Sequence, residues 1–152
     1  RVSKLKAAIG KATIAVYPVL LGDQVDRQDG EQLAALVAEE FGGSVQAAAT
    51  DLPLKIAPNS NEQRRLWDLA RAFQAQVRAN PPAADYALYA EYTIRPIDQQ
   101  VWTVHFVVCN RAGEWVIVDF QNNHHDDFQR INPQNKSDCA RLIVKRLQGY
   151  LR

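Results

Sequence analysis

The sequence predicts a three-layer domain in which helices cover both faces of a mixed five-stranded β-sheet. Three observations predict this class. Three strand-like runs, two of them alternating, lie between Asp85 and Phe120; an apolar run extends from Ala12 to Leu21; and three segments repeat apolar residues at helical spacing. Strands that alternate with helices, followed by consecutive strands, are typical of a mixed sheet.

The size and charge of the chain favour one neutral globular domain. It has 152 residues, 47% of them hydrophobic and 23% charged, which suits a single core. Its 18 basic and 17 acidic side chains give a net charge of +1. A protein that binds nucleic acid through phosphate contacts normally has a basic excess, so no nucleic acid is expected as a partner.

Residues 12–152 are predicted to form a single domain. Residues 1–11 are expected to be a flexible lead-in, with a short helix as the alternative. The lead-in has four basic residues and few apolar ones. Because the chain begins with Arg1 and contains no methionine, we expect a processed polypeptide. No apolar run reaches the roughly 18 residues that span a bilayer. Any membrane attachment is therefore expected through a preceding anchor.

The first half of the chain predicts two strand–helix units. The run from Ala12 to Leu21 suits a strand covered on both faces, with pairing expected to stop near Tyr17 because Pro18 lacks an N–H donor. The polar loop that follows it lies where open α/β sheets place ligands. A helix is expected from Asp29 until Gly42 ends it, followed by a short strand at 44–50. A second helix begins after Asn59 or Ser60 and stops at Asn80-Pro81-Pro82. Its arginines are expected to face solvent; they are Arg64, Arg65, Arg71 and Arg78.

The second half predicts a three-stranded meander and a closing helix. Turns are expected at 95–98, with Pro96, and at 110–113, with Gly113. Alternation predicts that one face is covered by the last helix, 136–150, which Asn135 or Ser137 would cap. That face comprises Tyr86, Leu88, Trp102, Val104, Phe106, Val116 and Val118.

Handedness and hairpins then predict the order of the sheet. Two right-handed crossovers that leave the first strand in opposite directions put the first two helices on opposite faces. The hairpins make the fourth strand antiparallel to the others. The predicted order is 2-1-3-4-5.

Three segments carry a resemblance to a known family. They are Ile14–Pro18 (IAVYP), Ala84–Ile94 (ADYALYAEYTI) and Asn110–Phe120 (NRAGEWVIVDF), and an amphipathic helix closes the chain. In this element order the chain resembles the amino-terminal domain of the Tol-Pal system β-propeller protein and the lipoproteins of the curli-secretion and penicillin-binding-protein-activator type. The predicted fold is anticodon-binding-domain-like. The resemblance implies a periplasmic or outer-membrane-anchored location in bacteria and a non-catalytic role in binding proteins. It supplies no catalytic residues.

A polar row is predicted on the second face of the meander. Glu91, His105 and Asp119 share a face by alternation, with Tyr89 and Arg95 nearby. If the strands align them, the row could bind a metal or place a base beside an acid. The alternative is an exposed sheet face with ordinary cross-strand polar pairs.

The loop after the third strand contains His124, His125, Asp126 and Asp127. These residue types are ligands of zinc, so zinc is the one cofactor considered, although adjacent side chains seldom converge on one ion. The alternative is a polar loop whose side chains form turn and capping hydrogen bonds.

The two cysteines are predicted to be unpaired. Cys139 belongs to the apolar stripe of the last helix, and Cys109 shares the face of His105, so a Cys–His pair is one option and a packed thiol the other. Alternation places the two sulfurs on opposite faces of the sheet, which excludes a disulfide between them.

The function predicted from the sequence is protein binding without catalysis. The expected contact surface is an apolar patch with polar neighbours on the second face of the meander, and an overlying helix or loop is the alternative. This surface comprises Tyr89, Glu91, Arg95, His105, Trp115 and Asp119. The second hypothesis is a metal-binding domain or metal-dependent hydrolase that uses His105, Asp119 and the loop His124–Asp127. A nucleic-acid module on an anticodon-binding-like fold is the third.

Overall fold

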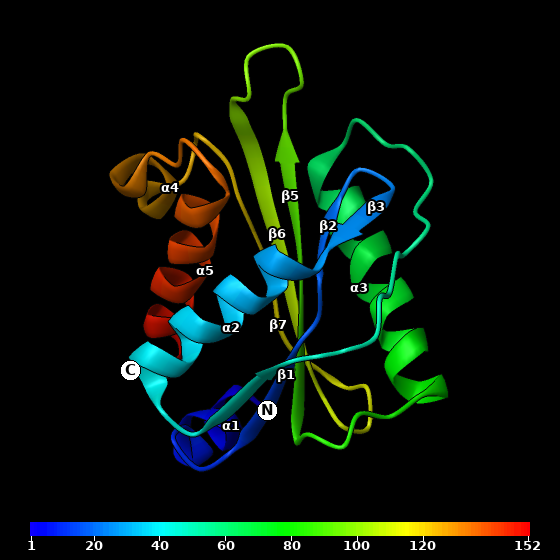
Figure 1. The fold of residues 1–152 in the computed structure, drawn as a ribbon, viewed down its shortest axis with the longest axis vertical. Coiled ribbons are helices and arrows are strands. Elements are labelled where there is room, and N and C mark those ends of the chain that lie inside the picture. The colour runs from blue at the N-terminus through cyan, green and yellow to red at the C-terminus, as the bar shows by residue number, and fades with distance from the viewer.

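The computed structural model describes residues 1–152, which form seven strands and five helices (Figure 1). In chain order these are α1 (Val2–Ala8), β1 (Thr13–Val16), β2 (Val19–Leu21), β3 (Gln24–Asp26), α2 (Arg27–Phe41), β4 (Ser44–Ala47), α3 (Glu62–Ala79), β5 (Tyr86–Ile94), β6 (Val101–Asn110), β7 (Trp115–Gln121), α4 (Asp126–Ile131) and α5 (Lys136–Leu151). None of the helices has the length and apolar character needed to cross a bilayer.

The strands form one mixed sheet, as predicted. β1 lies between β4 and β5 and is parallel to both, while β6 is antiparallel to β5 and to β7. The sheet has seven strands, however, where the predicted 2-1-3-4-5 order has five. Pairing stops at Pro18, resumes at Val19, and places β2 parallel to β5 and antiparallel to β3. The predicted loop after the first strand therefore contains β3.

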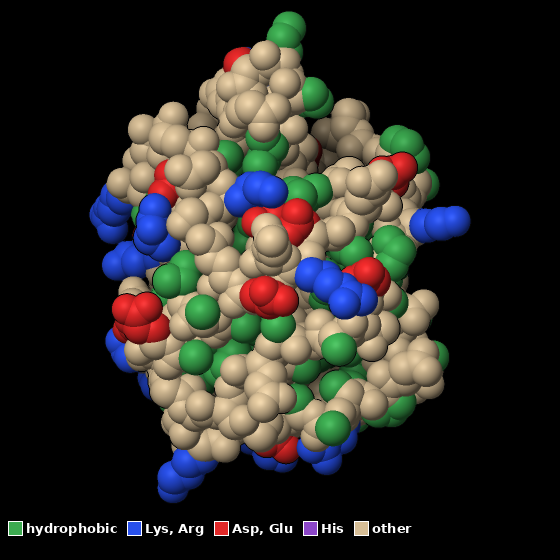
Figure 2. Space-filling model, in the orientation of Figure 1, with side chains coloured by type: hydrophobic (Ala, Val, Ile, Leu, Met, Phe, Trp, Pro, Cys, Tyr) green, Lys and Arg blue, Asp and Glu red, His purple; other side chains and the backbone are tan.

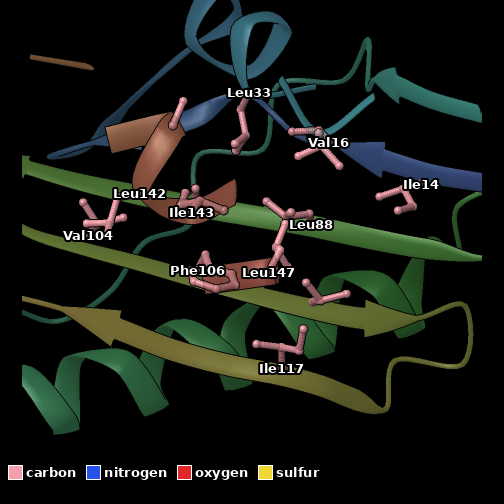
Figure 3. Packing of buried hydrophobic residues seen from close by; sticks show 14 of the residues in the cluster. Ile14, Val16, Leu33, Leu88, Val104, Phe106, Ile117, Leu142, Ile143 and Leu147 are labelled. Carbon is pink, nitrogen blue, oxygen red and sulfur yellow. The ribbon is translucent and has the colours of Figure 1, made fainter. Parts of the chain in front are cut away.

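Helices cover the sheet on both faces (Figure 1). On one face, α2 and α5 pack over β1, β5 and β6, and Figure 3 shows Leu33, Leu142 and Ile143 in this core. On the other face, α3 packs over Ala87, Tyr89 and other residues of β5 and β6. The prediction that the first two long helices lie on opposite faces is confirmed. Burying one of these large apolar side chains stabilises the fold by about 1.5–3 kcal/mol.

The amino terminus is part of this fold. Residues 2–8 form α1, and Leu5 is buried in the core on the α2 and α5 face. These residues therefore form the short helix that was the alternative, and not the flexible lead-in that was favoured. A single well-placed leucine in a short basic segment gave too weak a periodicity to favour the helix.

Side chains of Asp and Asn fix where the long helices begin. Asp26 caps α2 by accepting from the Asp29 N–H, Asn61 caps α3, and Asn135 caps α5. α2 starts two residues before the predicted Asp29, and the cap of α3 lies one or two residues after the predicted Ser60 or Asn59. The predicted cap of the last helix by Asn135 is confirmed.

A bulge in β7 changes which face its side chains occupy. Cys109 pairs with Trp115 and Val108 with Ile117, so Val116 is an extra residue between the two pairs. As a result, Val116 and Ile117 both pack in the core beneath α2 and α5. The predicted alternation of β7 is wrong from this point onward, because one inserted residue moves every later side chain to the other face.

Candidate functional site

Glu91 of β5 and His105 of β6 form the centre of the candidate site. They are direct partners in the antiparallel register, and Glu91 Oε1 lies 2.9 Å from His105 Nδ1. Glu91 is 2% exposed and His105 is fully buried. A buried carboxylate–imidazole pair must have further partners, because burying a charge without them costs several kcal/mol.

Helix α3 provides those partners. Arg65 donates to both carboxylate oxygens of Glu91, from Nε at 3.2 Å and from Nη2 at 2.5 Å. Glu62 Oε2 lies 3.0 Å from His105 Nε2 but is not aligned as a hydrogen bond, so this contact is ionic. Residues three apart in a helix share a face, which is why the first turn of α3 delivers both side chains to the sheet.

The four groups stabilise one another's charged forms. Burial favours the neutral form of Glu91, but hydrogen bonds from His105 and Arg65 outweigh burial and hold the pKa of Glu91 below its ordinary value. Burial likewise opposes protonation of His105, yet the carboxylates of Glu62 and Glu91 raise its pKa above the ordinary value. The result is a compact network of alternating charge, Arg65–Glu91–His105–Glu62, which we call the charge network.

A cavity of about 610 Å³ opens beside the charge network at the carboxyl ends of β2 and β5. Its charged lining residues are Glu62, Arg65, Glu91 and Lys136. Its apolar lining comes from Leu21, Pro58, Ile94 and Pro96. The sequence predicted a ligand site beside the loop that follows Leu21. The cavity has this position, since Leu21 and Gly22 line it.

A second hollow, of about 570 Å³, shares Glu62 and Gln99 with the first. It lies beyond the end of β7. The pairing of β6 with β7 ends at Val104 and Gln121, and the residues of β6 before Val104 have no β7 partner. Its lining is rich in carboxamide side chains. They are Gln99, Gln100, Asn122, Asn123, Asn132 and Gln134.

The β5–β6 hairpin separates the two cavities and projects from the end of the sheet (Figure 1). Ile97, in its turn, is 87% exposed, and Figure 2 shows hydrophobic surface at this end of the molecule. Trp102 is 51% exposed, and the guanidinium carbon of Arg95 lies 5.6 Å from its ring centroid. Arg95 also pairs with Asp98, which closes the turn.

Helix α3 covers most of the predicted contact surface. Tyr89, Glu91 and His105 are buried beneath it, and Trp115 donates from Nε1 to the Ala70 carbonyl of this helix. The prediction that these side chains contact a partner is therefore wrong, because α3 covers them. Arg95, another of the six predicted contact residues, lies in the projecting hairpin. The sequence could not show how far α3 extends across the meander.

Asp119 lies on the opposite face of the sheet from His105. The β7 bulge places it beneath α5, where it accepts from Arg146 Nε at 2.7 Å. His105 is instead paired with Phe120. The predicted row of Glu91, His105 and Asp119 thus keeps its first two members and loses the third, and the residues of the hypothetical hydrolase do not converge.

The segment His124–Asp127 leads into α4, which begins at Asp126 after His125 at the N-cap position. His125 Nδ1 accepts from the Asn122 N–H at 3.0 Å, and the His125 ring packs edge-on against Phe120. Asp127 accepts from Arg146 Nη1 at 2.9 Å. No three His, Cys, Asp or Glu side chains in the structure are grouped to hold a metal ion. Zinc binding by His124, His125, Asp126 and Asp127 stays a prediction for a zinc titration.

Both cysteines are free and buried, and they belong to cores on opposite faces of the sheet, as predicted. Burial raises the pKa of each thiol to about 12. Because the thiolate is the reactive form, this disfavours Cys109 as a nucleophile beside His105.

Sequence reasoning missed three residues that shape the site. Arg65 was grouped with the solvent-facing arginines of α3, and Glu62 was not singled out. The available signal was the spacing of Glu62 and Arg65, which are three residues apart and lie on the same face of the helix as the apolar Leu66 and Leu69. Trp102 was expected under the last helix, but β6 extends beyond the elements that would cover it.

Comparisons with known proteins do not place the chain in a family. No family model and no curated protein matches it. Among solved structures it is similar to a PelC dodecamer from Paraburkholderia phytofirmans, with 12% sequence identity over 90% of this chain and 88% of that chain. The TM-score of 0.44 is too low for this similarity to support a function.

Proposed function

We propose that this chain is a non-catalytic protein-binding domain of a bacterial cell-envelope assembly. The observation that supports it best is the projecting β5–β6 hairpin, which presents Ile97 almost fully to solvent. Ile97 contributes nothing to the core, and a partner that covered this turn would remove its apolar surface from water.

The cavity beside the hairpin extends this surface. Ile94 and Pro96 line it on the hairpin side, and Leu21 and Pro58 are also in its lining. Apolar groups surrounded by polar ones have the composition of a small protein interface. A partner would place an apolar side chain in the cavity while its own surface receives Ile97.

The charge network supports a structural role for His105. Its two ring nitrogens face Glu91 and Glu62, so neither is left free to act on a substrate. The network attaches α3 to the sheet and gives the hairpin a fixed base. The envelope location, in the periplasm or on the outer membrane, rests on the resemblance of element order and strand segments described from the sequence.

Site-specific photo-crosslinking in cells that naturally produce the protein tests the proposal. A photoreactive amino acid replaces Ile97 in one variant. In the other variant it replaces Ala112, a residue of the β6–β7 turn. Both positions are exposed hairpin turns. We expect a discrete protein adduct from position 97 only. Equal adducts from both positions, or none from position 97, would contradict it.

Fractionation of the natural precursor tests the location separately. We expect the protein in the periplasmic or outer-membrane fraction. Recovery in the cytoplasm would contradict the envelope assignment and leave the hairpin contact to be judged by crosslinking.

A further inference from the structure

The hollow beyond the end of β7 differs in chemistry from the cavity on the other side of the hairpin. Its lining combines one half-exposed aromatic ring, Trp102, with several carboxamide side chains. Carboxamides offer two donors and an acceptor in a plane, and an aromatic ring offers a flat apolar face with negative partial charge. This combination suits a ligand with many hydroxyl groups and apolar C–H faces.

The carboxamides have hydrogen-bonding capacity to spare. The side-chain oxygen of Asn122 accepts from the His124 N–H. That of Asn132 accepts from Gln134 Nε2, and that of Gln100 accepts from Arg95 Nη2. None of these bonds uses the NH₂ groups of the three side chains. The internal bonds therefore hold the amide planes while their donors remain available to a ligand.

The hollow also contains a buried hydroxyl without a partner. Thr103 is in its lining, and its Oγ1 is buried and makes no hydrogen bond. An unpaired buried polar atom is costly and uncommon.

The charges in the hollow are already compensated. Glu62 contacts His105, and Asp98 pairs with Arg95. Both carboxylates have cationic neighbours, so the site presents no uncompensated charge to attract an ion. A neutral ligand is therefore favoured over a charged one.

Trp102 is positioned to act as a platform. The guanidinium of Arg95 packs against its ring, which limits the rotation of the indole while leaving about half of the residue exposed. A side chain that is already ordered loses less entropy when a ligand stacks on it.

From these features we infer that the hollow binds a neutral glycan, with a sugar ring stacked on Trp102 and its hydroxyls bonded to Asn122, Asn132 and Gln100. This goes beyond the proposed protein contact, which uses Ile97 and the other cavity.

Calorimetry and saturation-transfer NMR with cellohexaose, maltohexaose and hexa-N-acetylchitohexaose test the inference. We expect at least one of these neutral oligosaccharides to bind. Trp102→Ala should weaken that binding about tenfold, the loss of one stacking contact. Asn132→Gly should weaken it about two- to tenfold. Glycine keeps the left-handed backbone that Asn132 has at φ 50° while removing the amide.

Trp67→Ala is the matched control. Trp67 is also a partly exposed tryptophan, but it belongs to α3, packs against Trp115 and is not part of the hollow. Binding should survive this change. Hexagalacturonic acid and a chitosan hexamer serve as anionic and cationic probes.

Three results would overturn the inference. They are no binding of any neutral oligosaccharide, binding of the charged probes alone, and binding that Trp102→Ala leaves intact. If the neutral sugars fail while Trp102→Ala abolishes crosslinking from position 97, the hollow is protein-binding surface instead. Ile97→Ser should leave sugar binding unchanged, so the inference and the proposed function can fail separately.

Discussion

Glu91 and His105 face each other across β5 and β6, and Arg65 from α3 binds both oxygens of the Glu91 carboxylate. This arrangement connects the helix layer to the centre of the sheet by ionic contacts rather than by apolar packing alone. A buried ion pair is not in itself a source of large net stability, but removing one member leaves the others uncompensated.

Replacing Glu91 by glutamine should therefore destabilise the protein. The change keeps the shape of the side chain but removes the charge that Arg65 and His105 share. We expect the free energy of unfolding to fall by about 1.5–3 kcal/mol, as for a lost hydrogen bond between charged groups. Urea denaturation measures it. The exposed Glu39→Gln is the control and should stay within about 0.5 kcal/mol of the unmodified protein. Equal stability of the two variants would show that the network contributes nothing.

The charge network should also make stability depend on pH. The pKa of His105 is raised in the folded protein, so its contribution is complete below the ordinary value of 6.5 and is lost as the pH rises through the folded pKa. The groups that face the ring are Glu91 from β5, Glu62 from α3 and the Phe120 ring from β7. Arg65 adjoins it through Glu91.

We expect the free energy of unfolding of the unmodified protein to decrease as the pH rises above 6.5 and through the raised pKa of His105. His105→Gln should lack most of that decrease, whereas the exposed His124→Gln should retain it. Denaturation curves at several pH values give the comparison. A decrease that persists unchanged in His105→Gln would assign the pH dependence to another group.

Two helical glycines should respond in opposite directions to the same substitution. A Cβ at Gly30 would lie 2.8 Å from the Tyr17 carbonyl oxygen and 2.9 Å from Pro18 Cα, both backbone atoms that cannot rotate away. Gly30→Ala should therefore destabilise by about 1–3 kcal/mol. A Cβ at Gly149 of α5 meets nothing within 4 Å, and Gly149→Ala should stabilise by up to about 1 kcal/mol. Thermal unfolding of both variants checks the pair. A Gly30→Ala variant as stable as the unmodified protein would contradict the packing of α2 against Tyr17 and Pro18.

The two thiols should be unreactive in the native protein. Cys109 and Cys139 are fully buried, and burial raises the pKa of each to about 12. We expect a thiol reagent such as Ellman's reagent to modify neither at neutral pH and both after unfolding in guanidinium. Rapid modification of one thiol before unfolding would show that its layer opens locally.

Much of the fold followed from local patterns. The meander, the three long helices and the position of α2 and α3 on opposite faces each depended on periodicity or handedness that a single sequence carries. Leu33, Phe73 and Leu142 are fully buried in the helix faces that their spacing indicated.

The candidate site was harder to predict because it depends on distances between elements. Glu91 and His105 could be matched by alternation because no irregularity interrupts the register between them. Asp119 was misplaced because the extra residue in β7 has no signature in the residues Trp115–Val118 themselves. Arg65 and Glu62 were overlooked because charged side chains of a helix usually face solvent, and their spacing beside Leu66 and Leu69 was not weighed against that rule.

The β7 bulge has a consequence for how the molecule tolerates change. It places Asp119 with Arg146 and Asp127 on one side of the sheet, while Arg65, Glu91, His105 and Glu62 occupy the other. No ion pair joins the two sets. We therefore expect the loss of stability from a substitution in one set to add to the loss from a substitution in the other, without amplifying it.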